Sequence, residues 1–418
     1  MIKLIHTSDW HLGQQFFGYD REAEHEAFLE WLLDVLDDEK ADVLLIAGDI
    51  FDVANPSAAS QRRFYNFLSE AHRRVDGLQI VIIAGNHDSS ARLEAPVPLL
   101  EEMNISVTGI VPRNEEGEID FESLIQPLYN KEGKREALCL TVPYLRQGDY
   151  PSADEGEVVE GDAYAVGIGR MYRHLIEYAL EHKAEDEALV AMGHLYVSGS
   201  ELSADDLSER TMVGGLDAVS SIVFTDAVVY TALGHIHKSQ KVGWKDSVRY
   251  AGSPLPMSFA EQNYHHRVMS VTLDGGKCVA VESLEIPRKV SLLRVPSVHM
   301  PAKDVIEKLS LLPEIAEGDN SSEYPFLEVR VLFTEPDPSF RYRVEEILSH
   351  KAVRLATVSV TYPDVDKKEG EDNPQTFADL QKMNPLDLLR RTYYSKYGNE
   401  LSEELTALFN DVMKEVEI

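Results

Sequence analysis

Short apolar runs alternate with longer amphipathic stretches through the first part of the chain. The apolar runs are rich in β-branched residues, as buried strands are, whereas the longer stretches repeat their apolar residues at helical spacing. In chain order the pattern predicts a strand at 2–6, a helix at 21–40, a strand at 41–52, a helix at 57–75 and the strand QIVII at 79–83. This βαβα alternation indicates a layered α/β domain with parallel strands.

Two further strands, at 188–195 and 226–237, extend this domain, which we expect to span residues 1–285. The pattern then changes to a smaller α/β unit over residues 286–363. Its predicted elements are a strand at 290–296, a helix at 302–311, a strand at 326–333, a helix at 339–349 and a strand at 352–361. A charged segment over 364–383 follows, and its composition is typical of a flexible linker.

The last segment, residues 384–418, is predicted to be a helical tail. Asn384 is a good N-cap and Pro385 suits the first helical position. One apolar stripe of the tail is formed by Leu401, Leu405, Leu408, Val412 and Val416. Because this stripe follows a linker, we expect it to bind a partner; a helical pair folded back on the second domain is the alternative.

Composition limits the class of protein. The chain has 418 residues, a hydrophobic fraction of 44% and a net charge of −32, from 40 basic and 72 acidic residues. That charge by itself argues against nucleic acid and anionic membranes as partners, since phosphate binding normally rests on clustered Lys and Arg. The acidic stretches 114–123 and 151–162 are predicted to be solvated loops. Two cysteines, no signal peptide and no apolar run of membrane-spanning length predict a cytoplasmic protein.

Polar residues follow five of the predicted strands. The strand ends read Asp9-Trp10-His11, Gly48-Asp49 (with Asp52), Gly85-Asn86-His87-Asp88, Gly193-His194 and Gly234-His235-Ile236-His237. Taken singly, each motif is more typical of a turn or of a buried histidine. Ligands of α/β sheets gather at the carboxyl ends of strands, so the five together predict one shared site.

The side chains at these strand ends indicate a metal site. Carboxylate, amide oxygen and imidazole without thiolate suit Mn²⁺, Fe²⁺ or Zn²⁺. The set is too large for one ion, whereas two ions bridged by a carboxylate would use it, and such sites hydrolyse phosphoesters. The remaining histidines lack this context and are interpreted as core, surface or cap residues: His6, His25, His72, His174, His182, His265, His266, His299 and His350.

The motif series D-x-H, GDxxD, GNHD, GH and GHxH resembles the calcineurin-like metallophosphoesterase superfamily. The stretches at 209–224, 232–242 and 250–261 narrow the resemblance to the bacterial SbcD family, the nuclease subunit of the SbcC–SbcD complex. The resemblance is dense over about residues 1–290 and looser beyond. It implies an αββα metallophosphoesterase sandwich, a small second α/β domain that caps it and binds DNA, and a C-terminal helical tail.

The resemblance also implies different roles for the polar residues. One ion would be held by Asp9, His11, Asp49 and His237, and the other by Asp49, Asn86, His194 and His235, with Asp49 as the bridge. His87 would not be a ligand but would stabilise charge and protonate the leaving oxygen. Asp88 would either orient its neighbour or cap the turn.

The implied activity is double-strand DNA exonuclease and single-strand or hairpin endonuclease, with Mn²⁺ preferred, in DNA repair and recombination. The implied assembly is a homodimer formed near residues 57–75 and 91–103, joined through the tail helices to the SbcC ATPase in a heterotetramer or larger complex. Two rivals stay open at this point. One is another metallophosphoesterase, such as a phosphodiesterase or protein phosphatase; the other is a metal-holding scaffold without activity, which an open metal site disfavours.

Overall fold

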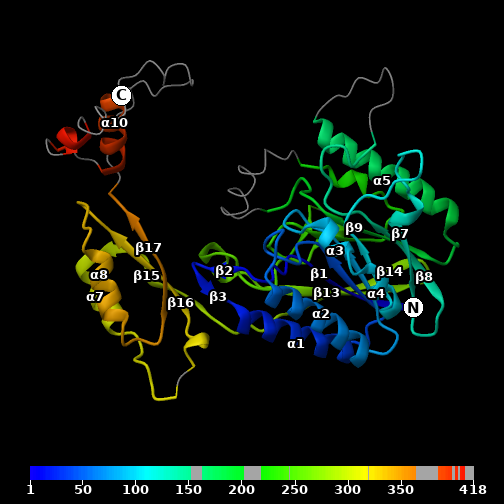
Figure 1. Ribbon diagram of the computed structural model, residues 1–418, viewed down its shortest axis with the longest axis horizontal. Helices are drawn as coiled ribbons and strands as arrows, with labels where there is room; N and C mark the ends of the chain where they lie inside the picture. Colours follow the sequence, from blue (N-terminus) through cyan, green and yellow to red (C-terminus); the bar gives the residue numbers. More distant parts are fainter. Residues whose placement is uncertain are drawn as a thin grey trace. The chain divides into compact units, whose positions relative to one another are not determined.

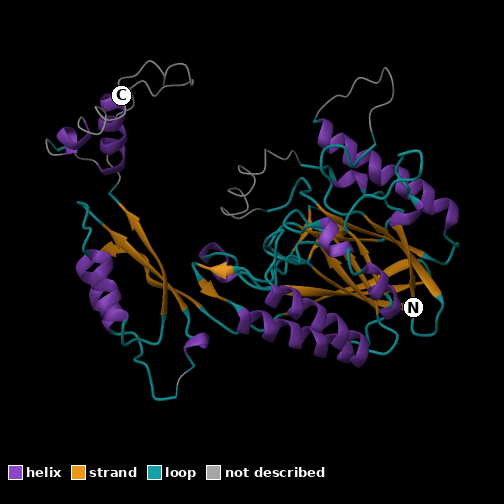
Figure 2. Cartoon of the chain, viewed as in Figure 1, coloured by secondary structure: helices purple, strands orange, loops and turns teal. Residues whose placement is uncertain are grey.

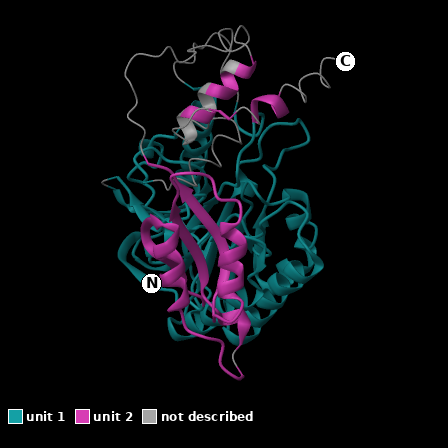
Figure 3. Ribbon diagram, turned by 90° about the vertical axis from the view of Figure 1, so that its left-hand side faces the viewer, with its two compact units in different colours: residues 1–289 teal, residues 290–418 magenta. Residues whose placement is uncertain are grey.

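The computed structural model describes residues 1–151, 162–201, 218–243, 245–318, 320–363, 385–397, 401–402 and 405–409. The chain forms two compact units, Met1–Lys289 and Val290–Ile418 (Figure 3). The expected linker at 364–383, the N-cap Asn384 and most of the acidic stretch 151–162 lie outside the described residues.

The first unit is built on two six-stranded sheets (Figure 2). The first sheet has the order β14 (Lys277–Glu285), β13 (Arg267–Asp274), β1 (Ile2–Thr7), β4 (Val43–Ala47), β5 (Gln79–Ile83) and β6 (Ile105–Thr108). The second has the order β11 (Gln240–Val242), β12 (Lys245–Tyr250), β10 (Tyr230–Gly234), β9 (Ala188–His194), β8 (Arg135–Thr141) and β7 (Ile125–Tyr129).

Three apolar layers hold these sheets together. One layer lies between the sheets and contains Leu4 and Val43 of the first sheet and Val190 of the second. The outer layers pack the first sheet against α1 (Glu22–Asp38) and α2 (Ala58–Arg74), and the second against α5 (Ala163–His182) (Figure 1). Because side chains alternate along a strand, each central strand serves two layers. The expected αββα sandwich is confirmed.

The centre of each sheet is parallel, whereas the β13–β14 margin of the first sheet and both margins of the second are antiparallel. In the first sheet β1, β4 and β5 are parallel, whereas β13 pairs antiparallel with both β1 and β14. The hairpin between β13 and β14 turns at Gly275 and Gly276, both with positive φ, which two-residue hairpin turns require. The expected parallel strands are therefore present in both sheets, and antiparallel strands, which need no crossover helix, are added at three of their four margins.

The helices near residues 57–75 and 91–103 differ in form. The first is one continuous helix, α2, with the Ser57 hydroxyl accepting a hydrogen bond from the Ser60 N–H. The second stretch is divided into α3 (Ser90–Glu94) and α4 (Val97–Leu100). Pro96 lies between them, and a proline supplies no N–H to continue a helix.

The second unit contains a three-stranded parallel sheet in the order β15 (Leu292–Pro301), β16 (Phe326–Leu332) and β17 (Arg354–Thr361). The crossover helices α7 (Ala302–Ser310) and α8 (Phe340–Leu348) pack on each other and on the sheet through one apolar cluster. All five elements expected here are present. The first strand runs further than expected, to Pro301.

Part of the tail is described. α10 runs over Pro385–Tyr397, and Leu405 and Leu408 farther along are 41% and 62% exposed. Val412 and Val416 lie outside the described residues. Among the helices that the structure describes, none is long and apolar enough to cross a membrane.

Candidate metal centre

The loops that follow β1, β4, β5, β9 and β10 meet at one edge of the sandwich. The first two run side by side: the Asp9 N–H donates to the Gly48 carbonyl and the His11 N–H donates to the Asp49 carbonyl, each at 3.0 Å. From the second sheet, the His235 N–H donates to Asp9 Oδ1 at 2.9 Å. The predicted convergence of distant strand ends is therefore present.

Four of the polar residues at this edge have left-handed backbone conformations. The φ angles are 54° for Asp9, 45° for His11, 51° for Asp49 and 97° for His235. Residues other than glycine rarely adopt positive φ, and the cost is of order 1–3 kcal/mol each. Several such residues in one site indicate that the surrounding structure holds these side chains in place for a function.

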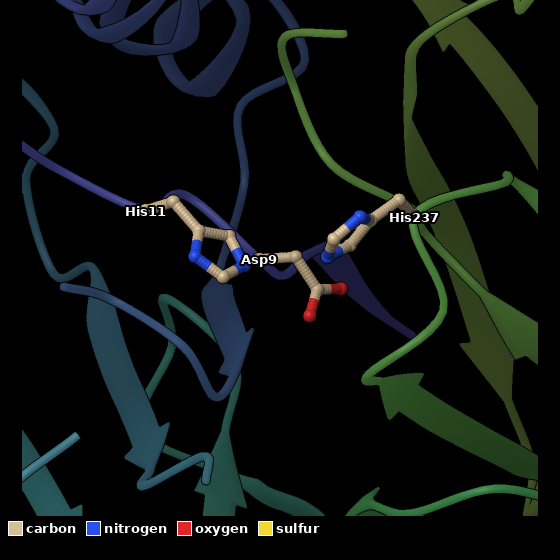
Figure 4. Close-up of side chains that lie close together, drawn as sticks. All are labelled: Asp9, His11 and His237. Atoms are coloured by element: carbon tan, nitrogen blue, oxygen red, sulfur yellow. The ribbon is translucent and has the colours of Figure 1, made fainter. Parts of the chain in front are cut away.

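Asp9, His11 and His237 form the first cluster (Figure 4). One potential ligand atom from each lies within 4.8 Å of the others, and all three side chains are buried. His11 Nδ1 lies 3.3 Å from Asp52 Oδ1, whereas His11 Nε2 is buried with no hydrogen-bond partner among the described residues. A buried imidazole nitrogen rarely stays unpaired, and a divalent cation would satisfy it.

Asn86, His194 and His235 form the second cluster together with Asp49. Asn86 Oδ1 lies 3.0 Å from His194 Nε2 and 3.0 Å from His235 Nδ1. His194 Nδ1 donates to the Ala47 carbonyl at 2.9 Å, so its Nε2 is directed at the cluster. Fixing one imidazole nitrogen on a carbonyl while the other faces a carboxylate and an amide oxygen is typical of a metal-binding histidine.

Asp49 connects the two clusters. Its Oδ2 lies 3.1 Å from His194 Nε2 and 3.8 Å from His11 Nε2. Burial opposes ionisation of Asp49, but the neighbouring histidines outweigh it and hold the pKa of Asp49 well below its usual range. Burial likewise opposes protonation of His194, yet the Asp49 carboxylate raises the pKa of His194 to about 9. This pair shows how strongly the site favours positive charge beside Asp49.

His87 and Asp88 lie next to the clusters with different contacts. The His87 N–H donates to Asp49 Oδ1 at 2.9 Å, and His87 Nδ1 donates to the Asp52 carbonyl at 2.8 Å. The Asp88 carboxylate accepts three backbone N–H groups, from Gly85, Ile50 and Phe51. Asp88 therefore caps the turn and ties two loops together, while the ring of His87 is anchored through Nδ1 and leaves Nε2 available.

Glycines allow the loops to approach this closely. A Cβ atom at Gly85 would lie 2.1 Å from Asp49 Oδ1, and one at Gly48 would lie 2.3 Å from His194 Nδ1. Neither distance is sterically possible, so any side chain at these positions would displace Asp49 or His194.

Glu261 is a candidate site residue that the motif series did not single out. Its carboxylate is 0% exposed, and Oε1 lies 3.7 Å from His237 Nδ1 while Oε2 accepts the Met257 N–H at 2.9 Å. Burial raises the pKa of Glu261, but the contact with His237 outweighs it and the net shift is downward. One indication of this role was present in the sequence: Glu261 is the single acidic residue in the stretch 250–261. It belongs to none of the five motifs.

Two histidines outside the motifs are confirmed as core residues. Burial lowers the pKa of His6 and of His25 to about 3, so both are neutral at physiological pH. The His6 ring contacts the Tyr230 hydroxyl at 2.9 Å, and His25 Nε2 lies 3.2 Å from the Trp10 carbonyl. Neither is directed into the metal clusters.

The fold and the clustered donors define a class. The chain matches the calcineurin-like phosphoesterase family over residues 2–239, and a family described as the type 5 capsule protein repressor C-terminal domain over residues 288–397. The chain is therefore a calcineurin-like metallophosphoesterase, with donor groups that fit divalent metal ions.

Curated relatives define the family more narrowly. The chain is 36% identical to the SbcD subunit of the nuclease SbcCD from Rhodobacter capsulatus over 87% of this chain and 88% of that protein. It is 34% identical to the Escherichia coli K12 protein of the same name over 68% of each chain, and 28% identical to the Bacillus subtilis protein over 100% of this chain and 99% of that one. The chain belongs to the SbcD family.

Proposed function

We propose that this protein is the metal-dependent nuclease subunit of an SbcC–SbcD-type complex and hydrolyses phosphodiester bonds in DNA. The observation that carries the proposal is the convergence of five strand-end motifs around Asp49, in a chain similar along most of its length to SbcD subunits of SbcCD nucleases. The double-strand exonuclease and the single-strand or hairpin endonuclease activities are part of the proposal.

We assign one ion to Asp9, His11, Asp49 and His237, and the other to Asp49, Asn86, His194 and His235. The orphaned Nε2 of His11 supports the first set. The contacts of Asn86 Oδ1 with two imidazoles support the second, since an ion between these atoms would replace those contacts. Two divalent ions held there, Mn²⁺ in our proposal, would supply the Lewis acidity that phosphoester hydrolysis needs.

We propose that His87 acts as an acid beside the reacting phosphate. Because Nδ1 donates to the Asp52 carbonyl, the ring is held in one orientation with Nε2 available to a substrate. Protonated at Nε2, His87 would donate a hydrogen bond to the developing negative charge and then the proton to the leaving oxygen. Asp88 supports this residue by holding the turn on which it lies.

The net charge of −32 bears on substrate binding. A chain this acidic must rely on its ions for phosphate affinity and on a partner for holding a duplex, so we expect poor and strongly salt-sensitive binding of duplex DNA by the protein alone. We propose that the partner is an SbcC-type ATPase bound through the tail at 384–418, that residues 286–363 act as a capping and DNA-binding domain, and that the nuclease is a homodimer. The cytoplasmic location stays a prediction.

A nuclease assay tests the proposal. The protein with Mn²⁺ should cleave hairpin or single-stranded DNA and hydrolyse bis-p-nitrophenyl phosphate, and both activities should disappear with EDTA. Addition of the ATPase and ATP should add degradation of duplex ends. Hydrolysis of the small bis-ester without cleavage of any DNA, even with the ATPase and ATP, would instead favour a phosphodiesterase with another substrate.

A further inference from the structure

A cavity of about 530 Å³ lies beside the candidate metal centre. Its walls come from the loop that follows β5 and from the segment that follows β8. Among the lining residues are Asp88, Ser89, Ser90, Tyr144, Arg146 and Gln147. None of these is a ligand in the two clusters, so the cavity adjoins the metal centre without being part of it.

Tyr144 connects the cavity to the metal centre. Its backbone N–H donates to the Ala84 carbonyl at 2.9 Å, which fixes it against the strand end that carries Asn86. The half-buried ring lies 6.2 Å from the ring of His194 and 6.4 Å from that of His235, measured between centroids. A group packed on this aromatic wall would therefore be next to the second metal cluster.

Arg146 gives the cavity a positive charge. Its guanidinium carbon lies 5.9 Å from the centroid of the Tyr144 ring, and the side chain is exposed. Other arginines of this unit, such as Arg63, Arg74 and Arg135, are paired with carboxylates. Within the described part of the chain the Arg146 guanidinium has no ion pair, and the residue's contact with a carboxylate is made by its backbone N–H.

Two acidic residues line the cavity, and the carboxylate of the first, Asp88, accepts three backbone N–H groups. Asp149 also lines the cavity, and its Oδ2 accepts the backbone N–H of Arg146 at 2.7 Å. The carboxylate thus closes the turn instead of pairing with the guanidinium. The guanidinium of Arg146 thus lies over the Tyr144 ring with no carboxylate partner among the described residues, which leaves it available to an external anion. A planar guanidinium that lies on an aromatic ring and is not paired with a carboxylate suits an anionic, planar ligand.

We propose that this cavity binds the nucleotide next to the scissile phosphate of a single DNA strand, with the base packed on Tyr144 and the phosphate bound by Arg146. The inference rests on the proposed nuclease function and deepens it. Stacking on an aromatic side chain accepts any base, and an arginine–phosphate contact reads no sequence, so the cavity would position a strand without sequence preference. It would also explain how a strongly acidic chain places DNA on its ions.

The test compares Arg146→Ala with the control Arg173→Ala, an exposed arginine on α5 that lies outside the cavity and removes the same charge. Binding of a fluorescein-labelled single-stranded oligonucleotide is followed by anisotropy over a range of salt concentrations. Arg146→Ala should weaken binding about 10-fold at low salt and reduce the slope of log K against log salt by about 0.7, the value for one phosphate contact on a single strand. Arg173→Ala should leave both unchanged.

Tyr144→Leu tests the aromatic wall, with Tyr144→Phe as the variant that keeps the ring. Loss of one stacked base corresponds to about 5-fold weaker binding or more, and the phenylalanine variant should recover most of it. Metal content and the rate on bis-p-nitrophenyl phosphate are measured in parallel. The ratio of oligonucleotide to bis-ester kcat/KM should fall about 10-fold for Arg146→Ala.

The outcomes separate this proposal from the proposed function. Equal salt slopes for Arg146→Ala and Arg173→Ala, or loss of metal in Arg146→Ala, would overturn the nucleotide site and leave the nuclease assignment in place. If the wild-type protein hydrolyses neither substrate, while Arg146→Ala still has a lower salt slope than Arg173→Ala, the nuclease assignment is overturned and the nucleotide site stands.

Discussion

Replacing His87 by glutamine separates catalysis from metal binding at this centre. The substitution removes the imidazole and keeps the backbone N–H that donates to Asp49 Oδ1 at 2.9 Å. The carboxylate that connects the clusters therefore keeps its contact, and none of the assigned ligands changes. We expect His87→Gln to retain both ions while losing the group that protonates the leaving oxygen.

The substitution should lower turnover strongly and stability only slightly. Loss of a general acid typically lowers the rate 10²- to 10⁴-fold, or about 3–5 kcal/mol in activation free energy. The cost in stability is much smaller, because the ring makes one part-buried hydrogen bond to the Asp52 carbonyl, worth about 1 kcal/mol. In a unit of this size that corresponds to about 2–4 °C in Tm.

The assay combines three measurements on His87→Gln and on His174→Gln, a control at an exposed histidine of α5. These are metal content by mass spectrometry, Tm by calorimetry and turnover of hairpin DNA with Mn²⁺. The expected result is wild-type metal content with turnover lower by about 100-fold or more. Loss of one ion would show that His87 is a ligand, and activity within a few-fold of wild type would show that the residue is structural.

Further predictions concern the ions and the tail. Asp49→Asn should weaken both ions together, because Oδ2 lies close to both His194 and His11, and mass spectrometry should find well under two ions per chain; two retained ions with unchanged activity would refute the bridge. Glu261→Gln should weaken metal affinity about 10- to 100-fold in calorimetry if the carboxylate, whose Oε1 lies 3.7 Å from His237 Nδ1, orients that imidazole; wild-type affinity would exclude this role. The pKa of His194 is raised to about 9 without metal, so binding must displace a proton at neutral pH. Mn²⁺ affinity should therefore rise up to about 10-fold per pH unit between about pH 7 and 9, and a flat profile would contradict it. Truncation after Pro374 should leave Tm nearly unchanged and abolish co-purification with the ATPase, as the exposure of Leu405 and Leu408 suggests; a collapse of stability would indicate a tail packed on the second domain.

The sequence by itself determined the local elements and the identity of the chemistry. Buried strands such as β4 and β5 are nearly continuous apolar runs, and α2 begins at a serine cap, so short-range patterns suffice to place them. The polar residues after each strand stand out because a buried strand otherwise ends in an ordinary turn. The donor types alone indicated divalent ions.

Only the tertiary structure decided which groups meet and how they are held. The antiparallel pairing of β13 with β1, the carboxylate of Glu261 beside His237 and the contacts of Asp88 with the N–H groups of Ile50 and Phe51 join residues well separated in the chain. No local pattern encodes such contacts, because they depend on which strands and loops become neighbours in the folded domain. The same packing brings Tyr144 and Arg146 to the rim of the metal centre. A sequence motif therefore indicates which residues are ligands. Their burial, backbone strain and supporting contacts arise only in the folded sandwich, and these fix the charge and orientation of each ligand.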